Sequence, residues 1–303
     1  MPQSHSKSKT PNASGQKAVV IGAGIIGVNV ALALQDKGYD VTILDRGEPG
    51  MGASFGNAGG IAGTECAPIA MPGTLMNVPG WLLDSLGPLS VRWGYLPKML
   101  PWLVRFLAAS SKSRVEQIAT ELAAILNRAW DDYDPVITKA GLADAVFKKE
   151  GAMAVYRSDA SRRKDDYAID LRRRNGIKIR DLTRAEVRDL EPDLAPIFSC
   201  GVMEEDWGRV LDPYKIVMGL YKCFLDQGGK FETAEVTAFV YRDGKPRAAR
   251  TTSGIRSPLI RLWLPVVHGP KRSPNVWGRQ YRLIPNGAIT PRCLITMPNC
   301  RAW

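Results

Sequence analysis

The hydrophobic pattern near the start of the chain predicts a strand, a helix and a second strand. Residues 17–21 form a short apolar run, and residues 28–38 carry apolar side chains at helical spacing up to Gly38, which is a typical helix end. The segment DVTILD at 40–45 follows, and it has the continuous apolar character of a buried parallel strand. Together these segments predict a β-α-β unit.

A long loop and several helices are predicted next. Residues 47–73 are rich in glycine and small residues but also apolar, which favours a binding loop over disorder. Residues 74–142 predict several helices with a turn around Pro97–Pro101. Four aromatic residues there predict an apolar, partly basic face, which either packs between helices or meets a membrane surface: Trp81, Trp93, Trp102 and Phe106.

The pattern from residue 151 onward alternates between strands and helices. Residues 151–158 alternate like a strand, and residues 161–176 predict one charged helix. Thr183 is expected to cap the helix that begins with RAEVRDL. A later helix is expected to open at Pro213 and to close at Gly228 and Gly229, with further strands after it.

The net charge comes mainly from one end of the chain. The 303 residues carry a formal charge of +11, but residues 1–253 hold 33 Lys/Arg against 30 Asp/Glu, a net +3. Residues 254–303 hold eight Lys/Arg, seven prolines, three tryptophans and no acid. Because the excess of basic residues lies in this last segment, the basic pI does not indicate which ligand the rest of the chain binds. No nucleic-acid partner is expected.

The cysteines and histidines exclude several kinds of site. The five cysteines have neither metal-site spacing nor the pattern of a disulfide framework, so no metal is expected and a reducing compartment is favoured. The two histidines, His5 and His268, lie near opposite ends of the chain, which disfavours a Ser-His-Asp or His-metal mechanism. With no secretory signal or spanning segment recognised, we expect a cytoplasmic location, with inner-membrane association as an alternative.

The segment IGAGIIG carries the residues that predict a ligand. Gly22, Gly24 and Gly27 have G-x-G-x-x-G spacing between the predicted strand and helix. The first permits a tight turn, the second lets a pyrophosphate approach the backbone, and the third lets helix and strand pack closely. Asp45 ends the second strand, where a carboxylate can accept a hydrogen bond from a ribose hydroxyl. This order predicts a dinucleotide site, and the unit alone fits NAD or FAD.

The residues that follow resemble a known family. DRGEPGMGASFGNAGGIAGTECAPIAMPG at 45–73 looks like the loop of FAD-dependent amine and amino-acid oxidoreductases, and closely like that of D-amino-acid dehydrogenases in the D-amino-acid oxidase superfamily. In that family an Asp-Arg pair ends the strand and a small-Ser-aromatic-x-Asn-Ala-Gly segment wraps the flavin. The resemblance covers roughly residues 17–254, including the helix around Pro213 and the strand AEVTAF.

The resemblance implies that FAD is the cofactor and that particular residues hold it. The glycine motif is expected to hold the pyrophosphate, Asp45 the ribose, and the Val236 backbone the adenine. Loop residues are expected near the phosphates or the flavin edge, although Ser54 and Asn57 would also suit hydrogen bonding within the loop. The catalytic residues are not predicted. The expected cofactor-binding residues are Gly22, Ala23, Gly24, Ile26, Gly27, Asp45, Arg46, Ser54, Asn57, Gly59 and Val236.

The resemblance also implies a fold and domain bounds. We expect an α/β fold, α+β overall, in which a Rossmann-type FAD-binding domain carries a smaller antiparallel-sheet substrate domain and the C-terminal third is missing or scrambled. The expected segments are a disordered extension at 1–16, the FAD-binding β-α-β unit and flavin loop at 17–75, a helical segment at 76–150, substrate-domain strands and helices at 151–206, a return to the FAD-binding domain at 207–254, and a non-native-like basic tail at 255–303.

The implied reaction is the oxidative deamination of D-amino acids. A hydride passes from the α-carbon to flavin N5, and the electrons go on to a quinone or dye-like acceptor. One alternative is a glycine or D-amino-acid oxidase that uses O₂. Another is an inactive remnant that only binds a nucleotide. Peripheral membrane association is a further expectation. In this family the groups that clamp the substrate carboxylate lie in the C-terminal third, and we recognise no such segment here.

The basic tail suggests a shifted reading frame. When the codons behind Trp263–Gly278 are read from their wobble bases, they permit GAWSKALAERLG, and those behind residues 281–289 permit IPLDTERGYH. D-amino-acid dehydrogenases show such segments after a strand like TTSGI; the alternative is a divergent true tail. We therefore expect a frameshift near residue 255, beyond which no native-like element forms. The parallel sheet would then lack the strand that should follow TTSGI.

Overall fold

The computed structural model describes residues 15–74, 76, 94, 96–143, 147–149, 151–242, 245–254, 256–258 and 261–263. The chain divides into two compact units. The first comprises Met1–Gly59, Val136–Val146 and Leu211–Trp303, and the second comprises Gly60–Pro135 and Phe147–Val210. The chain therefore leaves the first unit and returns to it twice.

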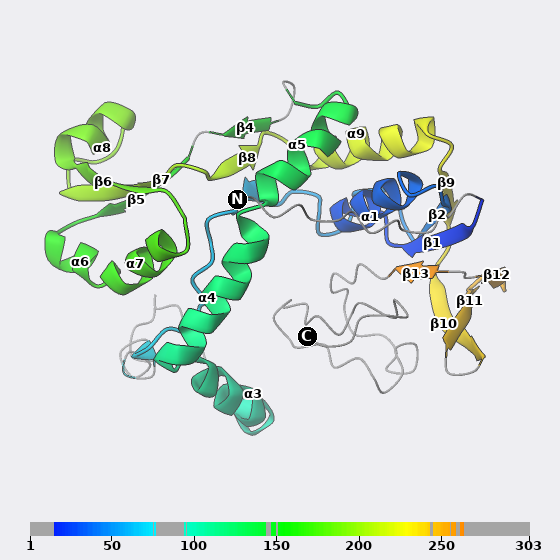
Figure 1. The fold of residues 1–303 in the computed structure, drawn as a ribbon, viewed down its shortest axis with the longest axis horizontal. Helices are drawn as coiled ribbons and strands as arrows, with labels where there is room; N and C mark the ends of the chain where they lie inside the picture. Colours follow the sequence, from blue (N-terminus) through cyan, green and yellow to red (C-terminus); the bar gives the residue numbers. More distant parts are fainter. Residues whose placement is uncertain are drawn as a thin grey trace, which may run out of the picture. The chain divides into compact units, whose positions relative to one another are not determined.

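A parallel sheet with strand order β13-β1-β2-β9 forms the centre of the first unit (Figure 1). β1 (Lys17–Ile21) pairs with β2 (Asp40–Asp45), and β2 pairs with β9 (Lys230–Thr233). On its other side β1 pairs with β13 (Arg261–Trp263). The apolar runs of β1 and β2 are largely buried, as is typical of strands in a parallel sheet.

Two helices lie side by side in the first unit. α1 (Ile25–Gln35) and α9 (Pro213–Asp226) contact each other, and the Gln35 amide donates a hydrogen bond to the Phe224 carbonyl oxygen at 3.0 Å. The Asp212 side chain caps α9 by accepting from two backbone N–H groups, and Pro213 occupies the first turn, where no N–H partner is needed. The predicted opening and end of this helix are thus confirmed.

An antiparallel sheet packs against the parallel one within the first unit. It contains β10 (Val236–Arg242), β11 (Lys245–Thr251) and β12 (Arg256–Pro258) in that order. Ala249 of β11 is fully buried and forms a cluster with Val19 and Leu44 of the parallel sheet. This contact places the start of β10 close to the parallel strands.

The second unit contains two small antiparallel sheets and most of the helices. One sheet has the order β5-β7-β6 and the other the order β3-β8-β4. Its strands are β3 (Gly60–Ile61), β4 (Phe147–Lys149), β5 (Ala152–Tyr156), β6 (Ile179–Thr183), β7 (Cys200–Glu204) and β8 (Gly208–Val210). The helices are α3 (Leu96–Ala109), α4 (Lys112–Leu126), α6 (Asp159–Arg163), α7 (Asp166–Arg174) and α8 (Arg184–Leu190), while α5 (Ala129–Lys139) runs from this unit into the first.

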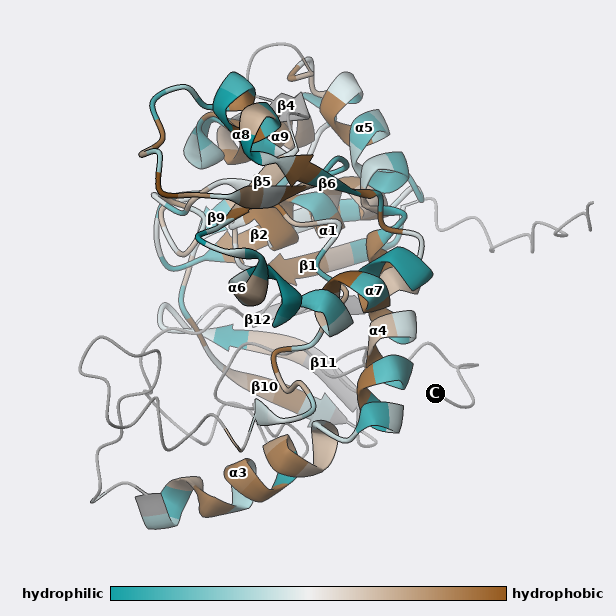
Figure 2. Cartoon of the chain, turned by 90° about the vertical axis from the view of Figure 1, so that its left-hand side faces the viewer, coloured by the Kyte–Doolittle hydropathy of each residue, from teal (hydrophilic) through white to brown (hydrophobic). Residues whose placement is uncertain are grey.

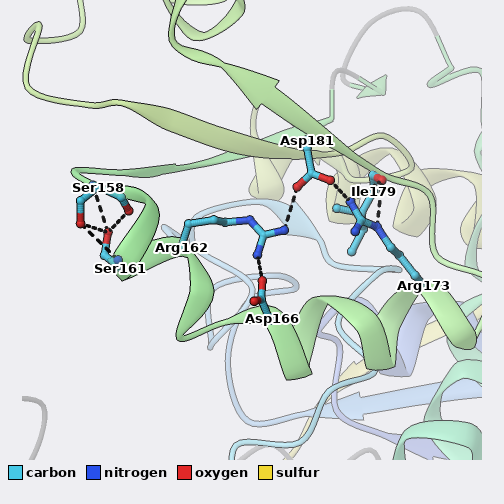
Figure 3. Close-up of polar contacts among 7 residues, drawn as sticks. All are labelled: Ser158, Ser161, Arg162, Asp166, Arg173, Ile179 and Asp181. Atoms are coloured by element: carbon cyan, nitrogen blue, oxygen red, sulfur yellow. Dashed lines mark hydrogen bonds and ion pairs between the residues drawn. The ribbon is translucent and has the colours of Figure 1, made fainter.

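A network of charged side chains connects α6, α7 and β6 (Figure 3). Arg162 donates to the carboxylates of Asp166 and Asp181, the latter at 2.7 Å. Arg173 donates to the other Asp181 oxygen at 2.5 Å and to the Ile179 carbonyl oxygen at 3.2 Å. We call these four charged residues the Asp181 network. It fixes two helices against one strand.

Two local predictions about helices are wrong. α3 runs through Pro97 and Pro101, where a turn was expected. Pro97 lies in the first turn, which needs no N–H partner, and Pro101 comes early enough to disturb only one further turn. The single charged helix expected at 161–176 is instead α6 and α7, because the capping box at Ser158 starts a helix early and a turn at Lys164–Asp165 ends it.

Short stretches near the two chain ends pair with the first unit. The carbonyl of Gln16 accepts from Asp40 N–H at 2.9 Å. Beyond residue 255, β12 pairs with β11, and β13 supplies β1 with a parallel neighbour. Such pairing needs only backbone groups, which a changed side-chain pattern leaves intact. That this tail forms no native-like element stays a prediction, which amide hydrogen exchange across residues 265–300 would test. Residues 1–14 and 264–303, with Trp81 and Trp93, lie outside the described residues.

Candidate cofactor-binding site

The carboxyl ends of three parallel strands meet at one edge of the sheet in the first unit. Gly22, directly after β1, donates its N–H to the Leu44 carbonyl oxygen at 2.7 Å. Ala234, directly after β9, donates to the Asp45 carbonyl oxygen at 2.7 Å. Ligands of open α/β sheets bind at this kind of edge.

The glycine motif forms a tight turn into α1. Gly22 has a φ of +109°, a conformation that favours glycine. Gly24 is the N-cap of α1, and a Cβ on it would lie 3.2 Å from the Ser54 Oγ. The N–H groups of Ile26 and Gly27 lie in the first turn, where no intrahelical carbonyl is available. With the positive end of the helix dipole they form a site suited to an anion.

The Asp45 carboxylate lies against this turn. One of its oxygens accepts from Ala23 N–H at 2.7 Å, and the other accepts from Gly47 N–H at 3.0 Å. Asp45 thus connects the end of β2 to the glycine turn. A carboxylate has about four acceptor positions, so these two bonds leave capacity for hydroxyl donors of a ligand.

Two polar residues of the long loop have different partners. Ser54 is 7% exposed, and its Oγ accepts from Ile25 N–H at 3.0 Å, at the start of α1. Asn57 is exposed and bonds within the loop: its amide donates to the Ala53 and Ser54 carbonyl oxygens at 3.3 Å, and its Oδ1 accepts from Gly59 N–H at 2.9 Å. The structure therefore brings Ser54 to the glycine motif, whereas Asn57 shapes the loop.

The remaining predicted residues lie around the same edge. Arg46 follows β2 and is exposed, and Ile26 is 38% exposed at the start of α1. Val236 begins β10, two residues after Ala234, and packs against the buried Val19 and Leu44. All the predicted binding residues belong to the first unit.

Comparison with known proteins decides which family this site belongs to. Residues 17–262 match the family described as FAD dependent oxidoreductase. The chain belongs to this family. The match includes the glycine motif, the long loop and both sheets of the first unit, and it ends inside β13. The cofactor of this family is FAD, in agreement with the choice made from the loop sequence.

Several curated relatives of this FAD dependent oxidoreductase are named D-amino-acid oxidase or D-amino acid dehydrogenase. The chain is 37% identical over 243 residues to the D-amino-acid oxidase of Bradyrhizobium diazoefficiens. The aligned region covers 79% of this chain and 57% of the relative. The chain is 35% identical over 143 residues to D-amino acid dehydrogenase 2 of Ralstonia nicotianae, covering 47% and 34%. The chain thus spans about half the length, or less, of these relatives.

Solved structures agree on the fold. Glycine oxidase from Bacillus cereus has a TM-score of 0.52 at 19% identity, covering 82% of this chain and 54% of that one. L-proline dehydrogenase from P. horikoshii has a TM-score of 0.52 at 16% identity, covering 83% and 52%. The mixed α/β fold expected from the sequence is therefore confirmed, and these likenesses concern the fold alone.

The residues of the first unit suit the ADP half of FAD. Donors at the α1 N-terminus suit a pyrophosphate, because they are backbone N–H groups without intrahelical partners. The acceptor at Asp45 suits ribose hydroxyls. A Cβ on Gly24 would make a tight 3.2 Å contact with the Ser54 Oγ, and the absence of a side chain at this position lets a ligand approach the backbone. These residues are therefore the candidates for holding the ADP half of FAD.

Sequence reasoning missed a buried polar cluster in the second unit. Thr64, which is fully buried, donates its hydroxyl to the Glu204 carboxylate. Arg172 lies between Glu65 at 2.6 Å and Glu204 at 3.8 Å, and burial raises the pKa of the Glu204 carboxyl. The cluster connects the end of the long loop to α7 and β7. Its members lie up to 140 positions apart in the sequence, so no local sequence pattern predicts the contact.

Proposed function

We propose that the intact protein oxidises D-amino acids with FAD. The α-carbon loses hydrogen and an electron pair, the resulting imine takes up water, and a 2-oxo acid and ammonia leave. FAD, when bound, supplies the two-electron acceptor for this oxidation. The observation that carries the proposal is the 37% identity over 79% of the chain to a protein named D-amino-acid oxidase, within a family match over residues 17–262.

In this proposal the described residues of the first unit bind and orient the cofactor. The N–H groups of Ile26 and Gly27 donate to the pyrophosphate, and Asp45 accepts from the ribose. Ser54 holds the long loop against α1 through its bond to Ile25. These contacts fix one half of the cofactor, so that the other half is presented in one orientation. Orientation of this kind is a large part of what a protein adds to cofactor chemistry.

We propose a quinone or dye-like molecule as the second electron acceptor. The support is the sequence of the long loop, which most closely resembles that of D-amino-acid dehydrogenases. An oxidase that uses O₂ is the second candidate, and the name of the Bradyrhizobium relative favours it. Formation of hydrogen peroxide distinguishes the two, because only the oxidase produces it as its main reduced product.

We also propose that translation shifts frame near residue 255. Two observations support this proposal. Residues 254–303 contain eight Lys/Arg and no acid, unlike the balanced body, and the family match ends at residue 262. The gene sequence around codon 255 tests it directly: a single inserted or deleted base relative to related genes is expected. The proposal would be contradicted if the gene aligned with related genes through this region without any inserted or deleted base.

The functional experiment compares the 303-residue chain with a version whose frame is restored. Both are purified with FAD and given D-alanine or L-alanine, and ammonia, 2-oxo acid, dye reduction and peroxide are measured. The restored chain is expected to retain FAD through purification and to reduce the dye with D-alanine. The 303-residue chain is expected to bind added FAD more weakly and not to reduce the dye. A preference for L-alanine, or for NAD over FAD in thermal stabilisation, would contradict the assignment of substrate or cofactor.

A further inference from the structure

Tyr214 is distant in sequence from the long loop but contacts it at two places. It lies in the first turn of α9, where the Asp212 side chain accepts from its N–H at 3.0 Å. Its ring packs on the backbone of Gly50, because a Cβ at Gly50 would lie 3.2 Å from two of the ring carbons. The same ring meets the Phe55 ring edge to face, with centroids 5.6 Å apart and 77° between the planes. Tyr214 therefore contacts both ends of the loop segment 50–55.

This loop segment also bonds to the glycine motif. Gly50 has a φ of +76°, a conformation that favours glycine, and its N–H donates to the Ala23 carbonyl oxygen at 2.9 Å. The Ser54 Oγ accepts from Ile25 N–H at 3.0 Å. The segment thus contacts the beginnings of both α1 and α9, two helices that lie side by side (Figure 1).

Helix α9 gives Tyr214 a rigid base. Its residues Val217 and Leu220 are buried, and Figure 2 shows the central strands β1 and β2 of the same unit as hydrophobic. A buried apolar face fixes a helix in place. The loop is different, because residues 51–53 and 55–58 are exposed. Its conformation therefore depends on the few contacts that it makes with the two helices.

A second tyrosine of α9 provides a comparison. Tyr221 is half-buried, as Tyr214 is. Its ring also meets a partner edge to face, namely Phe231 of β9, with centroids 5.6 Å apart and 85° between the planes. The two tyrosines thus have similar packing in the same helix, but Tyr214 packs on the loop and Tyr221 on a strand of the sheet.

We propose that Tyr214 is a positioning residue for FAD. Its ring holds residues 50–55 in place, so that Ser54 occupies the N–H of Ile25 and leaves the next N–H groups of α1 to the pyrophosphate. Without the ring the loop would have more conformations, and the cost of ordering it would be subtracted from the binding free energy. This role rests on the cofactor contacts proposed for the first unit and not on the identity of the substrate.

The test measures how tightly the purified 303-residue chain binds FAD, by flavin fluorescence, and ADP, by calorimetry. ADP has the diphosphate and ribose without the flavin, so it reports on the glycine motif and its surroundings. Tyr214→Leu keeps an apolar side chain but loses the ring. It is expected to bind both ligands about three- to tenfold more weakly, which is the range that corresponds to one aromatic pair. Tyr214→Phe keeps the ring and should bind both like the parent.

A double-variant cycle with Ser54 separates positioning from general packing. If Tyr214 acts by holding Ser54, then Tyr214→Leu and Ser54→Ala remove the same contribution. The double variant is then expected to bind ADP within about twofold of the weaker single variant, whereas independent effects would multiply. Tyr221→Leu is the matched control. It removes a similar ring contact and should lower the thermal stability, but it should bind both ligands like the parent.

Circular dichroism confirms that each variant folds. If Tyr214→Leu does not fold, Phe55→Leu decides the matter, because Phe55 is 54% exposed and its replacement removes the ring pair from the loop side. This variant too is expected to bind both ligands more weakly, and parent-like binding would count against the proposal.

Three results would overturn the proposal. Folded Tyr214→Leu could bind FAD and ADP as tightly as the parent does. The effects of Tyr214→Leu and Ser54→Ala could multiply, or Tyr221→Leu could lose as much affinity, and either result would make Tyr214 a packing residue only. The parent chain could bind neither ligand, which would remove the cofactor site from the first unit and this role with it.

Discussion

At the scale of single residues, Gly24 lies close to a buried side chain of the long loop. It stands between the strand end and α1, and a Cβ on it would lie 3.2 Å from the Oγ of Ser54, which is tighter than an ordinary contact. Asp45 fixes the other side of the turn through two backbone N–H groups. Gly24 and Asp45 both determine the backbone geometry of this turn. Conservative substitutions of either residue should therefore change the affinity for FAD measurably.

Replacing Gly24 with alanine should weaken FAD binding about tenfold, in line with the roughly 1–3 kcal/mol cost of overpacking a tight site. The new methyl group would lie 3.2 Å from the Ser54 Oγ and push the loop away from α1. Titration of flavin fluorescence measures the affinity. Gly52→Ala is the control, because a Cβ there meets nothing within 4 Å. Equal affinities of the two variants would show that the contact is unimportant.

Replacing Asp45 with asparagine should also weaken FAD binding, by roughly tenfold or more, because one charged acceptor is worth about 1.5–3 kcal/mol. The asparagine NH₂ would face a backbone N–H that the carboxylate now accepts from. Asp40→Asn is the matched control: Asp40 begins the same strand and pairs with Lys230 at 3.2 Å. The assignment of Asp45 fails if both variants bind FAD like the parent.

At the scale of elements, the Asp181 network connects α6, α7 and β6. Arg162 is 15% exposed and contacts two carboxylates, while Asp181 accepts from two guanidinium groups. The hydrogen bond from Arg162 is the largest cause that lowers the pKa of the Asp181 carboxyl below its ordinary 3.8. A charged pair with one well-buried member contributes more than a fully exposed pair.

Asp181→Asn should lower the free energy of unfolding by about 1 kcal/mol at pH 7, a value kept small because Asp181 itself is 58% exposed. The pKa is lower in the folded state, so the unfolded state binds more protons at acidic pH. The stabilisation is therefore complete above pH 3.8 and is lost as pH falls through the folded-state pKa.

Urea titrations at several pH values measure this difference between parent and variant. The gap between their stabilities should narrow as pH falls below 3.8. Asp132→Asn removes an exposed pair with Arg128 in the same unit, where both side chains are more than 60% exposed, and should change little. A pH-independent gap would show that Asp181 acts through packing instead of charge.

The sequence predicts best those elements whose pattern is local. β1 and β2 have the predicted bounds because apolar runs and glycines define them without help from distant residues. Thr183 and Glu186 form the predicted cap through a contact between neighbours. The Thr64–Glu204 bond and the β1–β13 pairing were not foreseen, because each depends on residues that only the folded chain brings together.

At the scale of the whole molecule, the candidate site lies in the first unit, within residues 22–59 and 234–236. A chain that ends at Trp263 should therefore bind FAD within about twofold of the 303-residue chain, since it keeps every assigned contact. A chain that ends at Gly254 loses β13 and leaves one edge of β1 unpaired. It should unfold at a lower temperature and aggregate sooner, because open strand edges invite association.

Thermal unfolding followed by light scattering and flavin fluorescence measures both effects. The two truncations differ by nine residues, so the comparison isolates β12, β13 and the residues beside them. If the Trp263 truncation lost FAD as well, residues beyond 263 would contribute to the site. If the Gly254 truncation were as stable as the longer one, β13 would add nothing to the sheet.

The pairing of β1 with β13 and of β2 with β9 also determines when the sheet can be completed during synthesis of the chain. Arg261 follows Ile21 by 240 positions, and at roughly 5–20 residues per second a ribosome needs about 12–48 s to supply it. The second unit ends at Val210, before β9 is made. β1 and β2 are thus synthesised first but gain their outer neighbours, β13 and β9, late. Until then both outer edges of the β1–β2 pair are open, and a chaperone would have to cover them to prevent association.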